Sequence, residues 1–135
     1  MNTLFIRLEG PLQSWGERAQ WSVRDSATEP TKSGIVGLLA CASGVNEDDE
    51  IRKLSESITI GLRCDREGTP LIDYHTIGGG YHEPQLLEAT GKKKGKVGSP
   101  HTEISHRMYL HDASFLVAIQ SNAQLLEDLR SKIQN

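Results

Sequence analysis

Cysteine and long hydrophobic runs are both scarce in this chain of 135 residues. Cys41 and Cys64 are too few for a disulfide framework or a zinc site, so we expect two buried free thiols in a reducing cytosol. The longest apolar stretch, Gly34–Ser43, is far shorter than the ~20 residues of a membrane span. Charged Arg7 and Glu9 interrupt the N-terminal apolar run, which excludes a secretory signal there. We expect a cytoplasmic protein with no membrane contact.

Aromatic residues make up only 5% of the chain, and an excess of positive charge is lacking, because the formal net charge is −3. This charge excludes a globally basic nucleic-acid binder but allows a local basic patch. The charges are in fact unevenly spread. Acids gather at 47–50, and four lysines, called here the finger lysines, are Lys92, Lys93, Lys94 and Lys96. A hydrophobic content of 36% suffices for one packed domain.

The first third of the chain is predicted to contain one strand and two helices. Residues 2–9 alternate between apolar and polar side chains, which predicts a strand. Residues 13–30 show no periodicity and are predicted to form a long loop. Thr31 is the predicted N-cap of a helix over 34–42, and the nearly continuous apolar sequence of this helix predicts burial on most sides.

Gly34 and Gly37 disfavour that helix by about 1 kcal/mol each, so we expect another backbone or a ligand to approach closely there. Gly44 is a predicted C-terminal stop. Asn46 is predicted to cap a second short helix, with the acids of 47–50 in its first turn.

The remainder of the chain is predicted to contain four strands, a long loop and a closing helix. Four segments have the pattern of strands: 57–66, 71–76, 102–110 and 113–120. Asn122 is predicted to cap a closing helix over 123–132. Residues 78–100 are rich in glycine and lysine and are predicted to form a long loop or finger.

The predicted order is strand, helix, strand, an inserted hairpin-like excursion, strand, helix. This order is the βαββα part of a ferredoxin-like βαββαβ fold of the α+β class, with the last strand absent. We therefore expect a single domain over residues 1–135, with an inserted finger or thumb at about 77–101 and a truncated C-terminus. An unfinished sheet exposes an edge, which a downstream segment or another chain would complete.

Two features point to phosphate binding. The finger lysines alternate with glycines, so the backbone can approach a phosphate chain while each lysine neutralises one charge. The second feature is the start of the 34–42 helix, at Lys32, Ser33 and Gly34, called here the helix-start group. It offers free N–H groups at the positive end of a helix dipole but lacks the upstream glycines of an ATP-binding loop. A solubilising loop and an ordinary capped helix are the alternatives.

Histidine and aromatic residues suggest further contacts. His75, with Tyr74 or a finger lysine, has the chemistry for metal-independent RNA cleavage, and hydrogen bonding in the strand or stacking on a base is the alternative. Trp15 and Tyr74 are candidates for stacking on bases of single-stranded RNA. The five histidines lack the spacing of metal ligands, so we expect neither a metal nor a cofactor.

Five segments in order resemble a known family: 5–16, 30–44, 54–65, 73–76 and 102–117. They are similar to the CasD subunit family of type I-E CRISPR Cascade, part of the RAMP superfamily with its ferredoxin-like, RRM-like core. The resemblance implies a non-catalytic subunit in antiviral defence that caps a crRNA-guided surveillance complex. Such a subunit holds the 5′ handle of the crRNA and packs against the backbone subunit and the large subunit, while target DNA is contacted only indirectly.

The resemblance also implies roles for individual residues. The helix-start group would lie near the handle phosphates, and the finger lysines would steer and clamp the RNA backbone. Trp15 or Tyr74 would stack on a base. Arg107 would contact a phosphate or a neighbouring subunit.

The resemblance leaves alternatives open. Family members continue past the closing helix into a last strand and a segment with glycine and arginine, which we expect this chain to lack. In a sibling subtype the corresponding member cuts precursor crRNA, so a metal-independent endoribonuclease is one alternative. A module that binds only proteins is the other.

Overall fold

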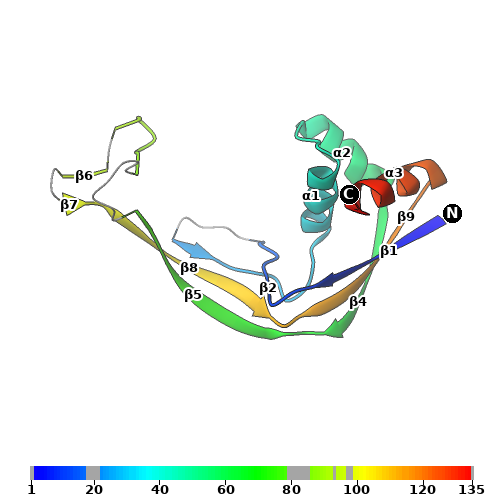
Figure 1. The fold of residues 1–135 in the computed structure, drawn as a ribbon, viewed down its shortest axis with the longest axis horizontal. Coiled ribbons are helices and arrows are strands. Elements are labelled where there is room, and N and C mark those ends of the chain that lie inside the picture. The colour runs from blue at the N-terminus through cyan, green and yellow to red at the C-terminus, as the bar shows by residue number, and fades with distance from the viewer. Residues whose placement is uncertain (1, 18–21, 79–85, 93, 97–98, 135) are drawn as a thin grey trace.

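A computed structural model describes residues 2–17, 22–78, 86–92, 94–96 and 99–134. The architecture is mixed α/β, with three helices in the described residues (Figure 1). The helices lie on one face of a three-stranded sheet, and together they form the body. A long two-stranded arm leaves the body and bends away from it, so the ribbon has the outline of an open U.

The body sheet has the strand order β1-β9-β4. The edge strands β1 (Asn2–Glu9) and β4 (Thr59–Arg66) both pair antiparallel with the central β9 (Ser114–Ser121). Because side chains alternate between the two faces of a strand, the apolar positions of each strand meet on the helix side. The predicted strand over 2–9 is confirmed.

Three helices cover that face: α1 (Lys32–Ala42), α2 (Asp48–Ser57) and α3 (Ala123–Gln134). Two predicted caps are confirmed. The Thr31 hydroxyl accepts a hydrogen bond from the Gly34 amide at 3.1 Å, and the Asn122 side chain accepts one from the Leu125 amide at 2.9 Å. No helix in the described part of the chain is long and apolar enough to cross a membrane.

The hydrophobic core lies between the helices and the sheet. Its buried members are Ile35, Val36, Leu39, Ile58, Val117, Ile119, Leu126 and Leu129. A second cluster of Leu110, Ala113 and Phe115 lies where the arm joins the body, and Trp15 packs against it.

The arm is an antiparallel hairpin of β5 (Thr69–Gly78) and β8 (Thr102–His111). Short strands β2 (Leu12–Gln13) and β3 (Val23–Arg24) pair with the other edge of β8. At the far end, β6 (Gly95–Lys96) pairs with β7 (Ser99–Pro100).

The corner between body and arm depends on Gly68. Its φ of +78° is left-handed, and a Cβ there would lie 2.8 Å from the Cβ of Ala113. Glycine is therefore required for β4 to turn into β5 against the neighbouring β8–β9 connection.

The prediction of buried thiols is wrong, because Cys41 and Cys64 are both exposed. The helices form a single layer, so α1 has neighbours on one side only, and its other face, with Cys41 and 46%-exposed Leu38, is open to solvent. This also corrects the prediction of a helix buried on most sides. Cys64 lines an open hollow of about 310 Å³ at the corner between body and arm.

Three further local predictions are corrected. The N-cap of α2 is Glu47, not Asn46, and it makes no side-chain capping bond. The strand predicted from Ser57 begins at Thr59, because α2 runs to Ser57. Within the predicted loop over 13–30, backbone pairing with β8 creates β3, which no sequence periodicity marks.

The two glycines of α1 are expected to respond oppositely to alanine. A Cβ on Gly34 would lie 2.9 Å from Cε3 of Trp15, whereas a Cβ on Gly37 would meet nothing within 4 Å. Gly37→Ala should therefore raise the free energy of unfolding by about 1 kcal/mol, the helix-propensity gain. Gly34→Ala should lower it, since overpacking costs about 1–3 kcal/mol. Urea unfolding of both variants measures this, and equal gains would contradict the Trp15 contact.

Candidate nucleic-acid interface

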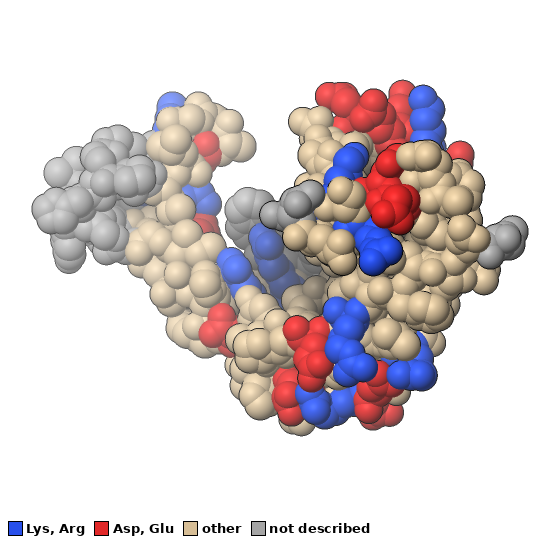
Figure 2. All heavy atoms as spheres, turned by 45° about the vertical axis from the view of Figure 1, so that its right-hand side comes forward, with Lys and Arg blue, Asp and Glu red and all other residues tan. Residues whose placement is uncertain are grey.

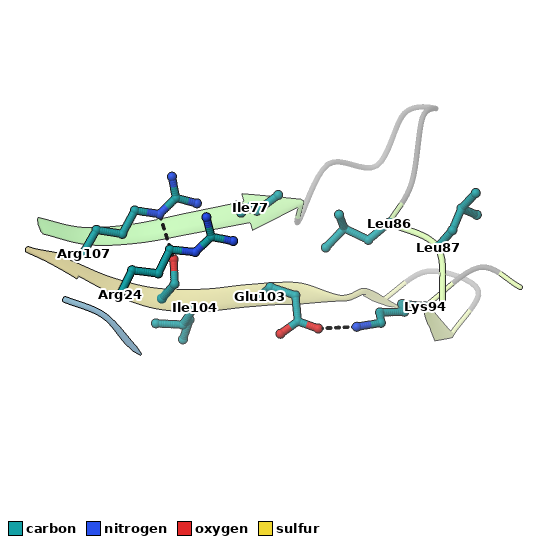
Figure 3. A pocket seen from close by; sticks show the side chains of 9 residues that line it. Arg24, Ile77, Leu86, Leu87, Lys94, Glu103, Ile104 and Arg107 are labelled. Atoms are coloured by element: carbon teal, nitrogen blue, oxygen red, sulfur yellow. Dashed lines mark hydrogen bonds and ion pairs between the residues drawn. The ribbon is translucent and has the colours of Figure 1, made fainter. Parts of the chain in front are cut away.

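A hollow of about 270 Å³ lies on the arm, beside the end of β3. We call it the arm hollow. Its lining residues are Arg24, Ile77, Leu86, Leu87, Lys94, Glu103, Ile104, Ser105 and Arg107 (Figure 3). The lining thus combines three cations and one acid with aliphatic side chains.

The cationic wall is built by the pairing of β3 with β8. The two strands run parallel, and Arg24 is the register partner of Arg107. The pairing is anchored by a hydrogen bond from the His106 amide to the Ser22 carbonyl at 2.9 Å. Because register partners project to the same face of a sheet, the two arginine side chains lie side by side, as Figure 3 shows.

These two guanidinium groups have no acidic partner among the residues that the structure describes. Arg107 donates from Nε to the Ser105 hydroxyl at 3.2 Å, and neither Arg24 nor Arg107 forms an ion pair within the described part of the chain. Two adjacent, unneutralised guanidinium groups repel each other and bind an anion favourably. Their planar donor forks match phosphate oxygens.

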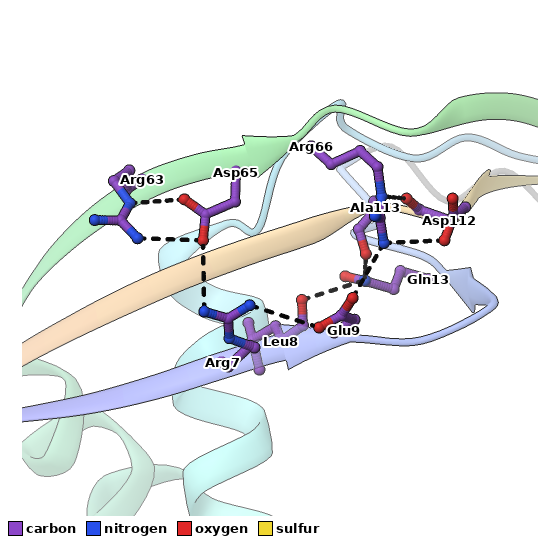
Figure 4. Close-up of polar contacts among 9 residues, drawn as sticks. All are labelled: Arg7, Leu8, Glu9, Gln13, Arg63, Asp65, Arg66, Asp112 and Ala113. Atoms are coloured by element: carbon purple, nitrogen blue, oxygen red, sulfur yellow. Dashed lines mark hydrogen bonds and ion pairs between the residues drawn. The ribbon is translucent and has the colours of Figure 1, made fainter.

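The other arginines that the structure describes are neutralised, which distinguishes the arm hollow among them. On the sheet face opposite the helices, Arg7, Arg63 and Arg66 are paired with the carboxylates of Glu9, Asp65 and Asp112 (Figure 4). The hydrogen bond from Arg63 lowers the pKa of Asp65 and keeps its carboxylate charged. This network links β1 to β4 and to the corner between body and arm. Its charges neutralise one another and do not form a cationic surface.

The space-filling view shows the charge distribution on one side of the molecule (Figure 2). The molecule is hollowed between the arm and the body, and basic side chains gather along that recess. Acidic side chains gather instead at the top of the body, where the first turn of α2 carries Asp48, Asp49 and Glu50. The net charge of −3 is therefore compatible with a local cationic surface.

Glu103, the acid of the arm hollow, is itself neutralised. Its Oε1 accepts hydrogen bonds from the Lys94 amine and, at 3.2 Å, from His101 Nε2. The Lys94 hydrogen bond lowers the pKa of Glu103 below its usual value of 4.5, against the opposing effect of desolvation, and the His101 hydrogen bond lowers it further. An ionised Glu103 that is held by Lys94 leaves the charge of the two arginines uncancelled.

Removing Lys94 is expected to raise the Glu103 pKa toward 4.5. Because the folded-state pKa is depressed, the stabilisation from this contact is present above pH 4.5 and is lost as the pH falls through the lower folded value. Carboxyl-detected NMR titration of wild type and Lys94→Gln measures the shift. Lys92→Gln, an exposed lysine nearby, is the control, and an equal shift in both variants would contradict the pairing.

The predicted helix-start group is brought together with Trp15. The Trp15 ring lies against Gly34, so the expected close approach at Gly34 is made by a side chain. Lys32 donates from Nζ to the Ile58 carbonyl at 3.3 Å, and Ser33 shares a hydrogen bond with the Thr31 hydroxyl at 3.2 Å. The half-buried Trp15 also donates to Gln13 at 3.2 Å, so these groups have partners inside the body.

Tyr74 and His75 are not brought together. They are consecutive in β5, so their side chains project to opposite faces of the arm. His75 shares the Arg107 face and places Nδ1 3.2 Å from the Asp73 carboxylate. Tyr74 is 60% exposed on the other face and contacts the His106 ring edge to face, with centroids 5.4 Å apart.

The finger lysines are only partly described. Lys92 is exposed, and Lys94 is half-buried in its pair with Glu103. Lys96 lies in β6, where only the backbone is described. Lys93 lies outside the described residues. No group of three or more His, Cys, Asp or Glu side chains in the described residues is arranged to hold a metal ion.

Sequence reasoning missed Arg24 and the aliphatic side of the arm hollow. Arg24 sits in a stretch without periodicity, and only its pairing with β8 gives it a neighbour. The segment is held by hydrogen bonds from the Trp15 amide to the Ser26 hydroxyl at 2.8 Å and from the Ala27 amide to the Trp15 carbonyl at 2.7 Å. Arg107, by contrast, was predicted.

Comparison with known proteins identifies the family of this chain. The model of the family described as "CRISPR-associated protein (Cas_Cas5)" matches residues 3–135. The chain belongs to this family. A Cas5 relative, the CRISPR system Cascade subunit CasD of Escherichia coli (strain K12), is 36% identical over 126 residues, which cover 86% of this chain and 52% of that protein.

Solved structures support the Cas5 assignment. A chain of a "CRISPR RNA-guided surveillance complex" is 35% identical with a TM-score of 0.82, and the match covers 96% of this chain and 54% of that one. A "Crystal structure of Cas protein" is 35% identical with a TM-score of 0.67, and the match covers 99% and 52%. The chain therefore spans about half the length of the relatives that it matches.

Proposed function

We propose that this Cas5-family chain is a non-catalytic subunit of a Cascade-type surveillance complex and binds the 5′ handle of crRNA at the arm hollow. The observation that carries the proposal is the Arg24–Arg107 couple on β3 and β8, which forms no ion pair with any described residue. Each arginine that contacts a phosphate releases counterions and forms charge-assisted hydrogen bonds. The 36% sequence identity with a Cascade subunit supports crRNA as the ligand and the cytoplasm as the location.

The fold proposal is a single ferredoxin-like domain with an inserted finger. The order β1-β9-β4, with α1 and α2 between β1 and β4 and with α3 after β9, supports it. The second edge of β1 is unpaired within the described residues, and we propose that the fourth strand pairs there. We place the inserted finger at about 77–101, between β5 and β8 in the chain.

The proposed partners are the backbone subunit, the large subunit and crRNA, with target DNA contacted only indirectly. Among the predicted RNA contacts, exposed Lys92 is free to steer the strand, and we assign Lys93 and Lys96 the same role. Lys94 contributes indirectly, because it pairs with Glu103 and so keeps that carboxylate from cancelling the charge of the two arginines. The helix-start group, Trp15 and Tyr74 lie outside the proposed RNA path, because their side chains face the body or the other side of the arm.

The test is fluorescence-anisotropy binding of a labelled 5′-handle RNA and of a scrambled RNA of equal length across a salt series. We expect tighter binding of the handle, and affinity that falls linearly with the logarithm of salt concentration. Negligible binding of both RNAs would refute the proposal and favour a module that binds only proteins. Equal but salt-dependent binding would refute specificity for the handle.

Cleavage of precursor crRNA is the second candidate, and the contact of His75 with Asp73 is the observation that favours it. A carboxylate orients an imidazole for proton transfer, but metal-independent cleavage also needs an acid for the leaving oxygen. Tyr74, the expected partner, projects to the other face. We therefore expect no product from repeat RNA in EDTA. Product that disappears in His75→Ala would overturn the non-catalytic assignment.

A further inference from the structure

Two residues with left-handed backbones lie at the corner between body and arm. The chain leaves the body between β4 and β5 and returns between β8 and β9. The first crossing contains Gly68, with φ +78°, and the second contains Asp112, with φ +59°. Asp112 is the one residue other than glycine with a positive φ among those that the structure describes. Such a backbone is uncommon for a residue with a side chain and persists where its surroundings hold it.

Arg66, the last residue of β4, provides two of the contacts that hold Asp112. Its Nε donates to the Asp112 carbonyl at 2.5 Å, and a terminal nitrogen lies 3.0 Å from the Asp112 carboxylate. The same nitrogen lies 3.1 Å from the carboxylate of Glu9, at the end of β1 (Figure 4). One guanidinium group therefore joins the strand that leads to the arm, the turn that returns from it and a second strand of the body.

The Arg66 contacts lie at the surface, so stability alone does not explain them. The Arg66 side chain is 48% exposed, and exposed ion pairs contribute little to the stability of a fold. A guanidinium group is planar, and its donors point in fixed directions, so it constrains the relative orientation of the groups that it binds. A lysine at the same position would offer a compact charge without this constraint.

The direction of the arm matters because basic side chains lie along the recess between arm and body. Arg24 and Arg107 lie on the arm, and other basic side chains gather along the recess (Figure 2). One RNA strand that contacts both sides binds more tightly when their separation is already fixed, because binding then costs less conformational entropy.

We propose that Arg66 is a positioning residue for RNA binding. By joining Asp112 to Glu9, it holds the arm at a fixed angle to the body and pre-organises the recess for one RNA strand. Arg66 itself lies on the sheet face opposite the helices and does not contact the RNA. The inference rests on the proposed function and adds a residue outside the arm hollow.

The first measurement is the distance between spin labels on the body and on the arm, by pulsed electron paramagnetic resonance. One label is attached to exposed Cys41 of α1 and the other at Ile72→Cys on the arm, with Cys64→Ser removing the thiol at the corner. We expect one narrow distance distribution. It should broaden in Arg66→Lys, because lysine keeps the charge but loses the planar set of donors.

The second measurement is binding of the 5′-handle RNA to the unlabelled protein. Arg66→Lys should weaken binding roughly fivefold, because the recess is no longer pre-organised. The slope of log affinity against log salt should not change, since Arg66 releases no counterion from the RNA. A smaller slope would make Arg66 a phosphate contact and would overturn the inference.

Arg63→Lys is the matched control. Arg63 lies on the same strand and is also exposed, but it pairs with Asp65, two residues away on β4, and not across the corner. This variant should keep both the narrow distance distribution and the RNA affinity of the wild type. Equal effects in the two lysine variants would overturn the inference.

The outcomes separate this inference from the proposed function. A distance distribution that stays narrow in Arg66→Lys would overturn the positioning role and leave RNA binding intact. A broad distribution with unchanged RNA affinity would overturn it as well. If the wild type binds no RNA, the proposed function and this inference fail together. Urea unfolding of each variant checks that the fold is retained.

Discussion

Replacing Arg24 and Arg107 together by Gln is expected to weaken binding of the handle RNA by roughly a hundredfold, because each charge-assisted bond contributes at least about 1.5 kcal/mol. The slope of log affinity against log salt should fall by roughly 1 to 2, since two phosphate contacts no longer release counterions. Gln removes the charge but keeps a polar side chain that can still donate hydrogen bonds. Anisotropy titrations at four or five salt concentrations measure both quantities.

A control with the same charge change uses two arginines outside the arm hollow. Arg52 pairs with Asp49 on α2, and Arg63 pairs with Asp65 on the sheet face opposite the helices. The double variant Arg52→Gln, Arg63→Gln loses the same two charges, and exposed ion pairs add little stability. It should bind RNA nearly as tightly as the wild type. If both double variants lose affinity equally, the effect is one of net charge and the site assignment fails.

The largest stability effect is expected for Phe115→Ala. Phe115 is fully buried at 0% exposure, in the cluster where the arm joins the body. Truncation there leaves a cavity, and losses for buried Phe→Ala run at about 3–5 kcal/mol. That is a large fraction of the roughly 5–15 kcal/mol by which native proteins are stable. Urea unfolding followed by circular dichroism measures the change.

The chain contains its own matched control, because its second phenylalanine, Phe5, is 63% exposed on the outer face of β1. Phe5→Ala should lower the free energy of unfolding by no more than about 0.5 kcal/mol. Similar losses in the two variants would mean that the junction cluster is not packed as described. If Phe115→Ala does not fold, Phe115→Leu provides a smaller cavity at the same position.

The strand over 2–9 and the helix cap at Thr31 were predictable from sequence, because each depends on residues that are close together in the chain. Alternation over 2–9 and the hydroxyl of Thr31 each act within one strand or one helical turn, and both predictions are confirmed. The exposure of Cys41 was not predictable in the same way. It depends on how many layers cover α1, and an apolar helix sequence does not reveal that number.

The residues of the candidate site also differ in whether the sequence predicted them. Arg107 was predicted because it lies in a strand-like segment that resembles a known family. Arg24 was missed because its importance comes from one register pair with a strand more than eighty residues away. The pairing of Lys94 with Glu103 was also missed, and the RNA contact expected of Lys94 stays a prediction. Charge counts from sequence do not distinguish paired from unpaired cations.

The central position of β9 has a consequence for how the protein is made. Both edge strands of the body depend on it, and Asn2 pairs with Ser121. At a synthesis rate of about 5–20 residues per second, β1 waits roughly 6 to 24 s for its partner to leave the ribosome. During that interval the apolar faces of β1 and β4 have no sheet to join. The body sheet can therefore form only after β9 has been synthesised.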